Sequence, residues 1–129
     1  MTVVTAAVII CNHRILICQR PRGKSLPLAW EFPGGKLESG ETLPQCLKRE
    51  LREELELDCK IGEAFMTSSF DYDFGTIELH AYFVRLKEQP QLTLHAHEQC
   101  RWVSPAELDQ YDFPPADRPF IQALQSLKL

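Results

Sequence analysis

Apolar residues along the chain follow two spacings, one typical of strands and the other of amphipathic helices. Residues 3–11 and 15–18 are rich in β-branched and apolar side chains, and Asn12 in the connection between them favours a hairpin. Apolar and polar residues alternate through 76–86, as they do in a half-buried strand. The other strands that the pattern predicts are 30–32, 59–71 and 101–103.

One helix is predicted from apolar residues that recur at every fourth position. These residues are Leu43, Leu47, Leu51 and Leu55. Thr42 is a suitable N-cap, because Gln45 three residues later closes a capping box around the first turn. A short helical segment at 105–108 and an amphipathic helix at 119–127 complete the predicted elements.

The length and composition are those of one domain, and no repeat, low-complexity tract or linker divides the chain. The net charge of −4 argues against binding to a nucleic-acid polymer, which normally requires a basic surface. The apolar amino-terminal run is too short to span a membrane and lacks a basic leader. The five cysteines are scattered without a CxxC pair, which favours reduced thiols over a disulfide framework. We therefore expect a cytoplasmic monomer without a membrane partner.

The segment GGKLESGET at 34–42 comes close to a phosphate-binding Walker loop. That motif has a glycine, four residues, Gly-Lys and then Ser or Thr. Gly35, Gly40 and Thr42 keep the spacing, but Glu41 occupies the position of the lysine. A carboxylate cannot neutralise a phosphate, so the Walker interpretation fails at this residue.

Three glutamates on the predicted helix suggest a metal site. At about 100° per residue, Glu50, Glu53 and Glu54 fall on one flank of the leucine stripe, away from the solvated face. An ordinary soluble helix would balance such acids with ion pairs, whereas Glu50 and Glu54 are like charges one turn apart and repel. Acids beside buried surface offer oxygen ligands to Mg²⁺, for which Mn²⁺ is a substitute.

A metal at these glutamates also accounts for the acidic residue in the glycine loop. The loop can fold over the helix, so that backbone groups near Gly34 and Gly35 join the metal, which then contacts the phosphates. Glu41 near the helix start suits the helix dipole. We expect Arg49 to be its ion-pair partner.

The chain is similar to the Nudix hydrolase family across residues 35–57. The matching positions of the Nudix box are Gly35, Glu41, Arg49, Glu50, Leu51, Glu53, Glu54 and Leu57. One position departs, because Glu56 stands where the family usually has glycine. We expect this departure to change the end of the helix and to leave the chemistry intact, with Gly35, Glu41 and Arg49 in structural roles.

The likeness extends over nearly the whole chain. The lead-in WEFPGGK and the segment DFPPADRP at 112–119 resemble the MutT branch, whose members hydrolyse nucleoside triphosphates and clean the nucleotide pool. WEFPGGK, HEQCRWVSPAEL and PPAD are also similar to bacterial CTP pyrophosphohydrolases within that branch. The resemblance implies a single domain, 1–129, with an α/β fold: an α/β/α sandwich with a mixed central sheet, the Nudix loop-helix and a C-terminal helix.

The resemblance also implies a reaction, the Mg²⁺-dependent attack of water on the β-phosphorus of a nucleoside triphosphate. The products are the monophosphate and pyrophosphate. By resemblance, Glu50, Glu53, Glu54 and the Gly34 carbonyl bind the metal, and Glu98 adds a ligand or acts as the base. Removing the proton of water requires a carboxylate within hydrogen-bond reach. Glu53 and Glu98 both remain candidates for that role, and Glu50 is counted with them as catalytic.

Four further residues are expected to contact the substrate. Arg20 matches a phosphate-contacting arginine of the MutT branch, although an ordinary surface charge is an equal alternative. Phe32 either lines the base pocket or packs in the core. Gly35 and Lys36 belong to the loop that would cover the phosphates.

Asp117 differs from the asparagine of the MutT pattern, since the chain has PPAD in place of PPAN. An ionised carboxylate only accepts hydrogen bonds, so it favours base edges with donors. Such edges are the amino groups of cytosine and adenine and the N7–H of 8-oxoguanine. The alternative is that Asp117 caps the terminal helix.

The histidines and cysteines do not indicate a second site. His95 and His97 precede Glu98, but no further Cys or His stands at a spacing typical of zinc sites, so we do not expect one. Cys46 and Cys100 have no evident catalytic partner.

Three functions are compatible with this pattern. The favoured one is hydrolysis of oxidised or modified nucleoside triphosphates such as 8-oxo-dGTP, with CTP, dCTP or 5-methyl-dCTP as the alternative substrates. A second is hydrolysis of ADP-ribose or another nucleoside diphosphate derivative, although such relatives often carry extensions that this short chain lacks. A third is a non-enzymatic nucleotide sensor, which would be expected to lose acids that are all present here.

Overall fold

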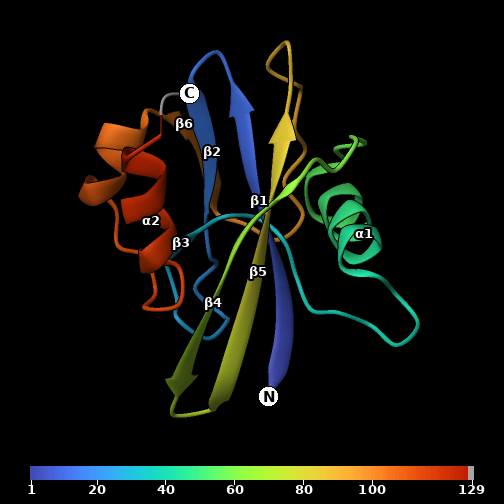
Figure 1. The fold of residues 1–129 in the computed structure, drawn as a ribbon, viewed down its shortest axis with the longest axis vertical. Helices are drawn as coiled ribbons and strands as arrows, with labels where there is room; N and C mark the ends of the chain where they lie inside the picture. Colours follow the sequence, from blue (N-terminus) through green and yellow to red (C-terminus); the bar gives the residue numbers. More distant parts are fainter. Residues whose placement is uncertain (128–129) are drawn as a thin grey trace.

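The computed structural model describes residues 1–127, so positions 128–129 of the expected domain lie outside the described residues. Figure 1 shows the elements in chain order. They are β1 (Thr2–Cys11), β2 (Arg14–Gln19), β3 (Trp30–Glu31), α1 (Leu43–Leu55), β4 (Ala64–Tyr72), β5 (Gly75–Arg85), β6 (Gln99–Val103), the 3-10 helix η1 (Pro105–Gln110) and α2 (Arg118–Gln125). Among these residues no helix is long and apolar enough to cross a membrane.

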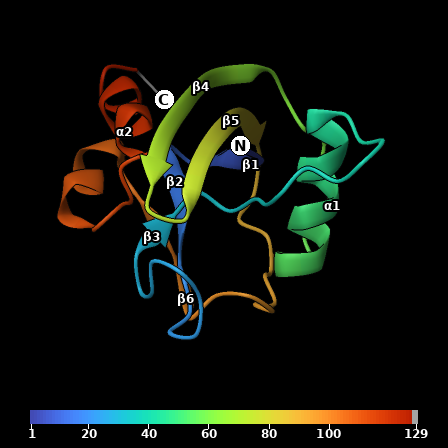
Figure 2. The same ribbon diagram turned by 90° about the horizontal axis from the view of Figure 1, so that it is seen from below.

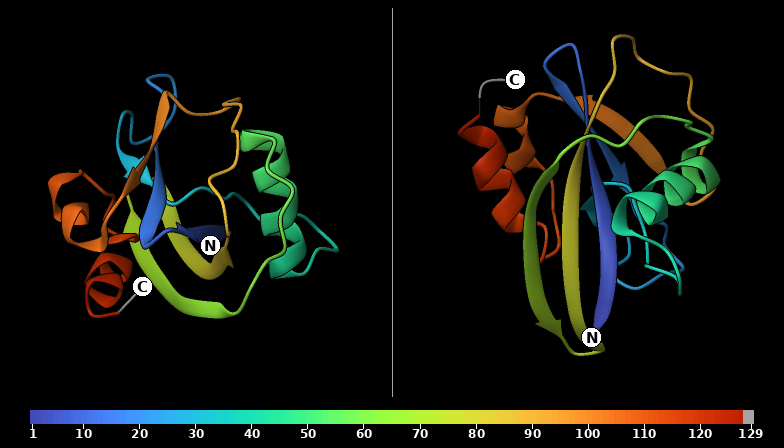
Figure 3. Two further views of the ribbon diagram at one scale, coloured as in Figure 1. Left: turned by 90° about the horizontal axis from the view of Figure 1, so that it is seen from above. Right: turned by 45° about the vertical axis from the view of Figure 1, so that its right-hand side comes forward.

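The strands form one mixed sheet in the order β3-β2-β1-β5-β4, and β6 pairs with β2 outside this path. The β1–β5 pair is parallel and the other pairs are antiparallel. Helix α1 lies on one side of the sheet, and η1 and α2 lie on the other (Figure 2). The view from above in Figure 3 shows the same three layers. The expected α/β/α sandwich is therefore confirmed.

Two apolar cores lie on the two faces of the sheet. Leu47, Leu51 and Leu55 of α1 are fully buried against Leu16 and Val84. The other core contains the C-terminal helix and the aromatic residues around it, Trp30, Phe32, Phe113 and Phe120. The leucine stripe predicted from the sequence thus packs on one face of the sheet, and the terminal amphipathic helix packs on the other.

The connection between β1 and β2 is a tight hairpin, as predicted. Asn12 and His13 have φ values of 51° and 64°, in the left-handed region that such turns require. Ile10 pairs with Ile15 across the ladder.

The predicted strand at 59–71 is wrong at its start, because β4 begins at Ala64. The preceding residues already follow β5, since the Gly62 amide donates to the Phe83 carbonyl at 2.8 Å. A side chain at Gly62 would press on that carbonyl. The register then shifts between Ala64 and Met66, so regular pairing starts only there.

The expectation of reduced cysteines is wrong for one pair. Cys18 and Cys100 stand directly opposite each other on β2 and β6 and form a disulfide. Their separation in the chain hides this pairing from any search for a spaced motif. The other three, Cys11, Cys46 and Cys59, are free and buried.

Helix α1 begins and ends with recognisable caps. Thr42 and Gln45 form the predicted capping box, with hydrogen bonds of 3.2 and 2.9 Å. At the other end Glu56 adopts a left-handed conformation with φ 54°, and the Glu56 and Leu57 amides donate to the carbonyls of Arg52 and Leu51. The bond from the Glu56 amide to the Arg52 carbonyl is the 5→1 bond of an αL C-cap, in which glycine is the usual residue at the left-handed position.

We predict that Glu56→Gly stabilises the protein. A left-handed conformation costs a residue with a Cβ roughly 1–2 kcal/mol, and glycine avoids this cost but loses more chain entropy on folding. The Glu56 carboxylate also meets His95 at 2.5 Å on the surface, and an exposed pair contributes about 0–1 kcal/mol. The net gain in the free energy of unfolding should be about 0.5–1 kcal/mol, measured by denaturant titration.

Glu56→Ala is the matched control for this prediction. It removes the same carboxylate but keeps a Cβ in the left-handed conformation, so it should give no gain. An equal gain from alanine would mean that the charge, and not the backbone conformation, limits stability.

Candidate active site

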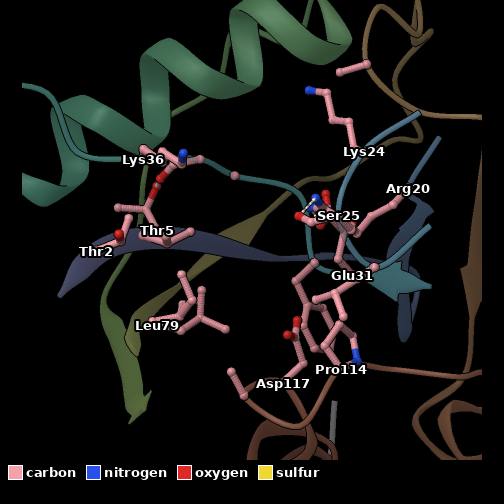
Figure 4. Close-up of a pocket in the computed structure, with 18 of the residues that line it drawn as sticks. Thr2, Thr5, Arg20, Lys24, Ser25, Glu31, Lys36, Leu79, Pro114 and Asp117 are labelled. Atoms are coloured by element: carbon pink, nitrogen blue, oxygen red, sulfur yellow. Dashed lines mark hydrogen bonds and ion pairs between the residues drawn. The ribbon is translucent and has the colours of Figure 1, made fainter. Parts of the chain in front are cut away.

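A cavity of about 710 Å³ opens between the sheet, the glycine loop and the segment before α2 (Figure 4). Its walls come from β1, β3, α1, the β4–β5 hairpin and the loop after β2. Among the residues predicted for the site, those that line it are Arg20, Phe32, Gly34, Gly35, Lys36, Glu50, Glu54 and Asp117.

The glycine loop is held against β1 by backbone hydrogen bonds. The amides of Thr5 and Ala7 donate to the carbonyls of Gly35 and Pro33, both at 2.8 Å. A side chain at Gly34 would collide with the Thr5 carbonyl, and one at Gly35 would collide with the Glu50 carboxylate. Only glycine allows this approach, which brings the loop against the first acid of the helix, as expected from the sequence.

The predicted pair of Glu41 and Arg49 is present and joins the loop to α1. The Arg49 guanidinium donates to both Glu41 oxygens, at 2.7 and 3.0 Å, and to the Lys36 carbonyl at 3.1 Å. The pKa of Glu41 is lowered to about 2, mainly by the hydrogen bond from Arg49. Arg49 also donates to Glu50 at 2.7 Å, so one side chain orients the loop and the acid together.

Glu50 and Glu54 share the wall of the cavity formed by α1. Burial raises the pKa of Glu54 well above its ordinary value, and the nearby charge of Glu50 raises it further. Within the described residues, Glu54 Oε1 is buried and has no hydrogen-bond partner. A partly buried pair of acids with an unpaired oxygen offers hard oxygen ligands, which fit a divalent ion of the Mg²⁺ type.

Glu53 and Glu98 lie apart from this pair. The Glu53 side chain is 59% exposed and meets Arg49 at 3.3 Å. Glu98 is exposed, and its backbone amide donates to the Gln19 carbonyl. Neither residue lines the cavity. Their roles as ligand or base therefore stay predictions.

A half-buried polar chain in the cavity wall was not predicted from the sequence. Glu31 accepts from Arg20 at 2.8 Å and meets His97 Nε2 at 2.8 Å. Burial acts to raise the pKa of Glu31, but the hydrogen bonds from His97 and Arg20 outweigh it and leave the pKa lowered. The available signal was a charged residue in a strand between two aromatic residues, Trp30 and Phe32.

Phe32 and Asp117 are neighbours in the cavity wall, where the Phe32 backbone hydrogen-bonds to the Asp117 carboxyl. Phe32 is buried, stacks on Phe113 with ring centroids 5.2 Å apart, and also lines the cavity, so it serves the core and the cavity at once. Asp117 is 7% exposed and its side chain makes no capping hydrogen bond to α2, which leaves the helix-cap alternative without support. Burial raises the pKa of Asp117 to about 8, and the charge of Glu31 adds to this.

The β4–β5 hairpin contributes two aromatic residues from the segment between the predicted strands at 59–71 and 76–86. Tyr72 and Phe74 both line the cavity, and their rings stack at 5.1 Å. The Tyr72 hydroxyl accepts from the Ala116 amide at 2.9 Å, so the hairpin is joined to the segment that carries Asp117. The stacked pair offers an apolar surface next to that carboxyl.

Comparisons with known proteins agree with this geometry. A model of the NUDIX domain matches residues 1–124. The chain is 38% identical to the CTP pyrophosphohydrolase of Escherichia coli, over 99% of this chain and 94% of that protein. It is 36% identical to the 8-oxo-dGTP diphosphatase of Haemophilus influenzae, over 92% of this chain and 88% of that protein.

One solved structure is similar to this chain in both fold and sequence. The solution structure of the Escherichia coli ORF135 protein superposes with a TM-score of 0.84 at 38% identity, covering 98% of this chain and 90% of that one. The family model, the relatives and the acids beside the glycine loop give one conclusion. The chain belongs to the Nudix family and is a hydrolase that acts on acid anhydrides.

Proposed function

We propose that this protein hydrolyses nucleoside triphosphates to the monophosphate and pyrophosphate, with oxidised or modified nucleotides such as 8-oxo-dGTP as substrates. Water would form a bond to the β-phosphorus, and the bond from that phosphorus to the oxygen of the α-phosphate would break. The observation that carries the proposal is one cavity that holds Glu50, Glu54 and the glycine loop together with the buried carboxyl of Asp117. A nucleotide needs both parts of such a cavity, because its phosphates would bind near the acids and the glycine loop and its base near the buried carboxyl.

The metal fits the residues present. Glu50, Glu54 and the Gly34 carbonyl would hold Mg²⁺, with Glu53 and Glu98 as the further ligands that the family resemblance implies. When bound, the ion supplies stabilisation of charge on phosphoryl oxygens and a lower pKa for bound water. Glu53 or Glu98 would accept the proton of the attacking water, and Arg49 holds Glu50 in place.

Arg20 and Lys36 are proposed to contact the phosphates. Both line the cavity, and Figure 4 shows Lys36 near Thr5 and Arg20 near Ser25 and Glu31. Arg20 is held by Glu31 at 2.8 Å and by the Ser25 carbonyl at 2.8 Å. A cation that is already oriented loses less freedom when it binds an anion.

Asp117 is proposed to read the base, but as an acid and not as a carboxylate. With a pKa of about 8 the carboxyl is mostly protonated at neutral pH, so it carries one O–H donor beside one acceptor. This pair complements the O6 and N7–H of 8-oxoguanine, and equally the N3 and amino group of cytosine. Unmodified guanine presents two acceptors, O6 and N7, and satisfies only the donor.

Cytosine nucleotides are the second candidate substrates. The complementarity of protonated Asp117 to cytosine favours them, as does the 38% identity to a CTP pyrophosphohydrolase. A panel of 8-oxo-dGTP, dGTP, CTP, dCTP, 5-methyl-dCTP and ADP-ribose, with Mg²⁺ and detection of pyrophosphate, separates the candidates. Fastest turnover of ADP-ribose, without release of pyrophosphate, would contradict the proposal.

Glu53→Gln should lower turnover of the best substrate in this panel by at least ~100-fold, because a close ligand or general base is lost. The fold should be retained, since the side chain is 59% exposed. Glu56→Gln, an exposed glutamate of the same helix end, is the matched control and should keep the wild-type rate. Near-normal turnover of Glu53→Gln would remove Glu53 from the site.

Glu54→Gln should abolish the stabilisation of the protein by Mg²⁺. A ligand that binds only the native state raises the melting temperature, and the amide removes one ligand oxygen. Without metal, the variant should melt at or above the wild-type temperature, because an amide needs no proton when buried. A full Mg²⁺-dependent shift in Glu54→Gln, measured by thermal unfolding, would rule out Glu54 as a ligand.

The pH dependence of kcat/KM tests Asp117. As the pH rises through about 8 the carboxyl loses its O–H donor, so kcat/KM for 8-oxo-dGTP or CTP should fall roughly tenfold or more. Asp117→Asn keeps a donor and an acceptor at every pH, so this inflection should vanish.

Asp112→Asn, an exposed acid at the start of the same segment, is the control and should keep the wild-type profile. An inflection that persists in Asp117→Asn would belong to another group, and the base would then be read elsewhere. An equal loss of activity toward every base in Asp117→Asn would have the same meaning.

A further inference from the structure

Three side chains with metal-binding atoms meet between β2 and the segment before β6. Cys18 on β2 pairs directly with Cys100 on β6, and His97 lies three residues before that cysteine. One ring nitrogen of His97 and the two sulfur atoms all lie within 4.8 Å of one another. This cluster is separate from the carboxylates of α1 that are proposed to hold Mg²⁺.

His97, one of the three residues of this cluster, has an unpaired ring nitrogen. Its side chain is only 2% exposed, and Nε2 is engaged with Glu31 at 2.8 Å. Within residues 1–127 the other nitrogen, Nδ1, is buried and has no hydrogen-bond partner. Buried polar atoms are nearly always paired, so a nitrogen left in this state calls for an explanation. A bound ion would supply its missing partner.

The chemistry of the cluster selects a soft cation. Two sulfurs and an imidazole favour Zn²⁺ and similar ions, whereas Mg²⁺ prefers oxygen. Zinc binds sulfur at about 2.3 Å and imidazole nitrogen at about 2.0–2.1 Å. The ligand atoms of one zinc ion therefore lie closer to one another than 4.8 Å, which is the distance within which the two sulfurs and the ring nitrogen of this cluster all lie. The contact of His97 with Glu31 matches the carboxylate–histidine–metal arrangement, in which the acid orients the ring.

We propose that Cys18, Cys100 and His97 form a redox-dependent site for a thiophilic divalent cation such as Zn²⁺. A small thiol or a dithiol protein would give two electrons and two protons to the Cys18–Cys100 disulfide and become a disulfide itself. The two resulting thiols then lose their protons to solvent as the cation binds both sulfurs and Nδ1. Water completes the fourth position of the ion.

The cluster reaches the nucleotide cavity through residues already described. His97 and Glu31 line that cavity, and Glu31 also holds Arg20. A cation on Nδ1 would fix the ring of His97 and, through Glu31, the guanidinium of Arg20. The redox state of one disulfide is thereby linked to a residue proposed to bind phosphate.

Co²⁺ provides the test, because its bond to a thiolate produces a charge-transfer absorption band that carboxylate ligands do not give. The full chain is reduced, freed of reductant under anaerobic conditions and titrated with Co²⁺ in excess Mg²⁺. We expect one equivalent to develop the band, and added Zn²⁺ to displace it. Cys18→Ser and Cys100→Ser should lose the band, and His97→Gln should weaken Co²⁺ binding at least ~10-fold.

Cys11→Ala and Cys59→Ala are the matched controls, because both thiols are buried and free and lie outside the cluster. They should keep the band. Oxidation of the wild type to the disulfide should abolish it and reduction should restore it, a readout that needs no variant to fold. A folded, reduced protein without the band would overturn the proposal, as would a band that survives in both serine variants. Neither result bears on nucleotide hydrolysis, since the readout contains no nucleotide.

Discussion

The approach of the glycine loop to both β1 and α1 is the constraint on which the site depends. Gly34 lies against the Thr5 carbonyl and Gly35 against the Glu50 carboxylate, at distances that no side chain allows. Backbone hydrogen bonds hold one side of the loop, and the Arg49–Glu41 ion pair holds the other. Since the loop cannot retreat, Glu50 and Glu54 remain beside it in spite of their mutual repulsion. The close approach of these two acids is thus fixed by the fold, and it supports the proposal that a cation binds there.

Three carboxyl side chains around this cavity, those of Glu31, Glu54 and Asp117, differ in the direction of their pKa shifts. Hydrogen bonds from Arg20 and His97 lower the pKa of Glu31, although its partial burial acts to raise it. For Glu54 and Asp117, burial outweighs the neighbours that act to lower the pKa, and both pKa values are raised. Composition counts these carboxyls alike, and only their surroundings distinguish the one whose pKa is lowered from the two whose pKa values are raised.

Local features were predictable from the sequence, and long-range ones were not. The helix, its capping box and the Glu41–Arg49 pair depend on residues a few positions apart, so periodicity and spacing were sufficient. The partner of Cys18 was hidden because β6 pairs with β2 only after the chain has folded back. The protonation of Asp117 was hidden for the same reason, since burial depends on residues from distant segments. The prediction of a strand at 59–71 was wrong at its start because Gly62 lies close to the Phe83 carbonyl, and no sequence pattern reveals that contact.

The parallel pairing of β1 with β5 also has a consequence for the order of folding. Thr2 lies beside Ile77 and Ile10 beside Arg85, so the centre of the sheet joins the first and the middle thirds of the chain. Closing such a large loop costs entropy before any contact repays it, which slows folding. Helix α1 can form early from its own caps, but the glycine loop rests on β1 and must wait for the sheet. Assembly of the proposed metal site is therefore expected among the last events of folding, after β5 has joined β1.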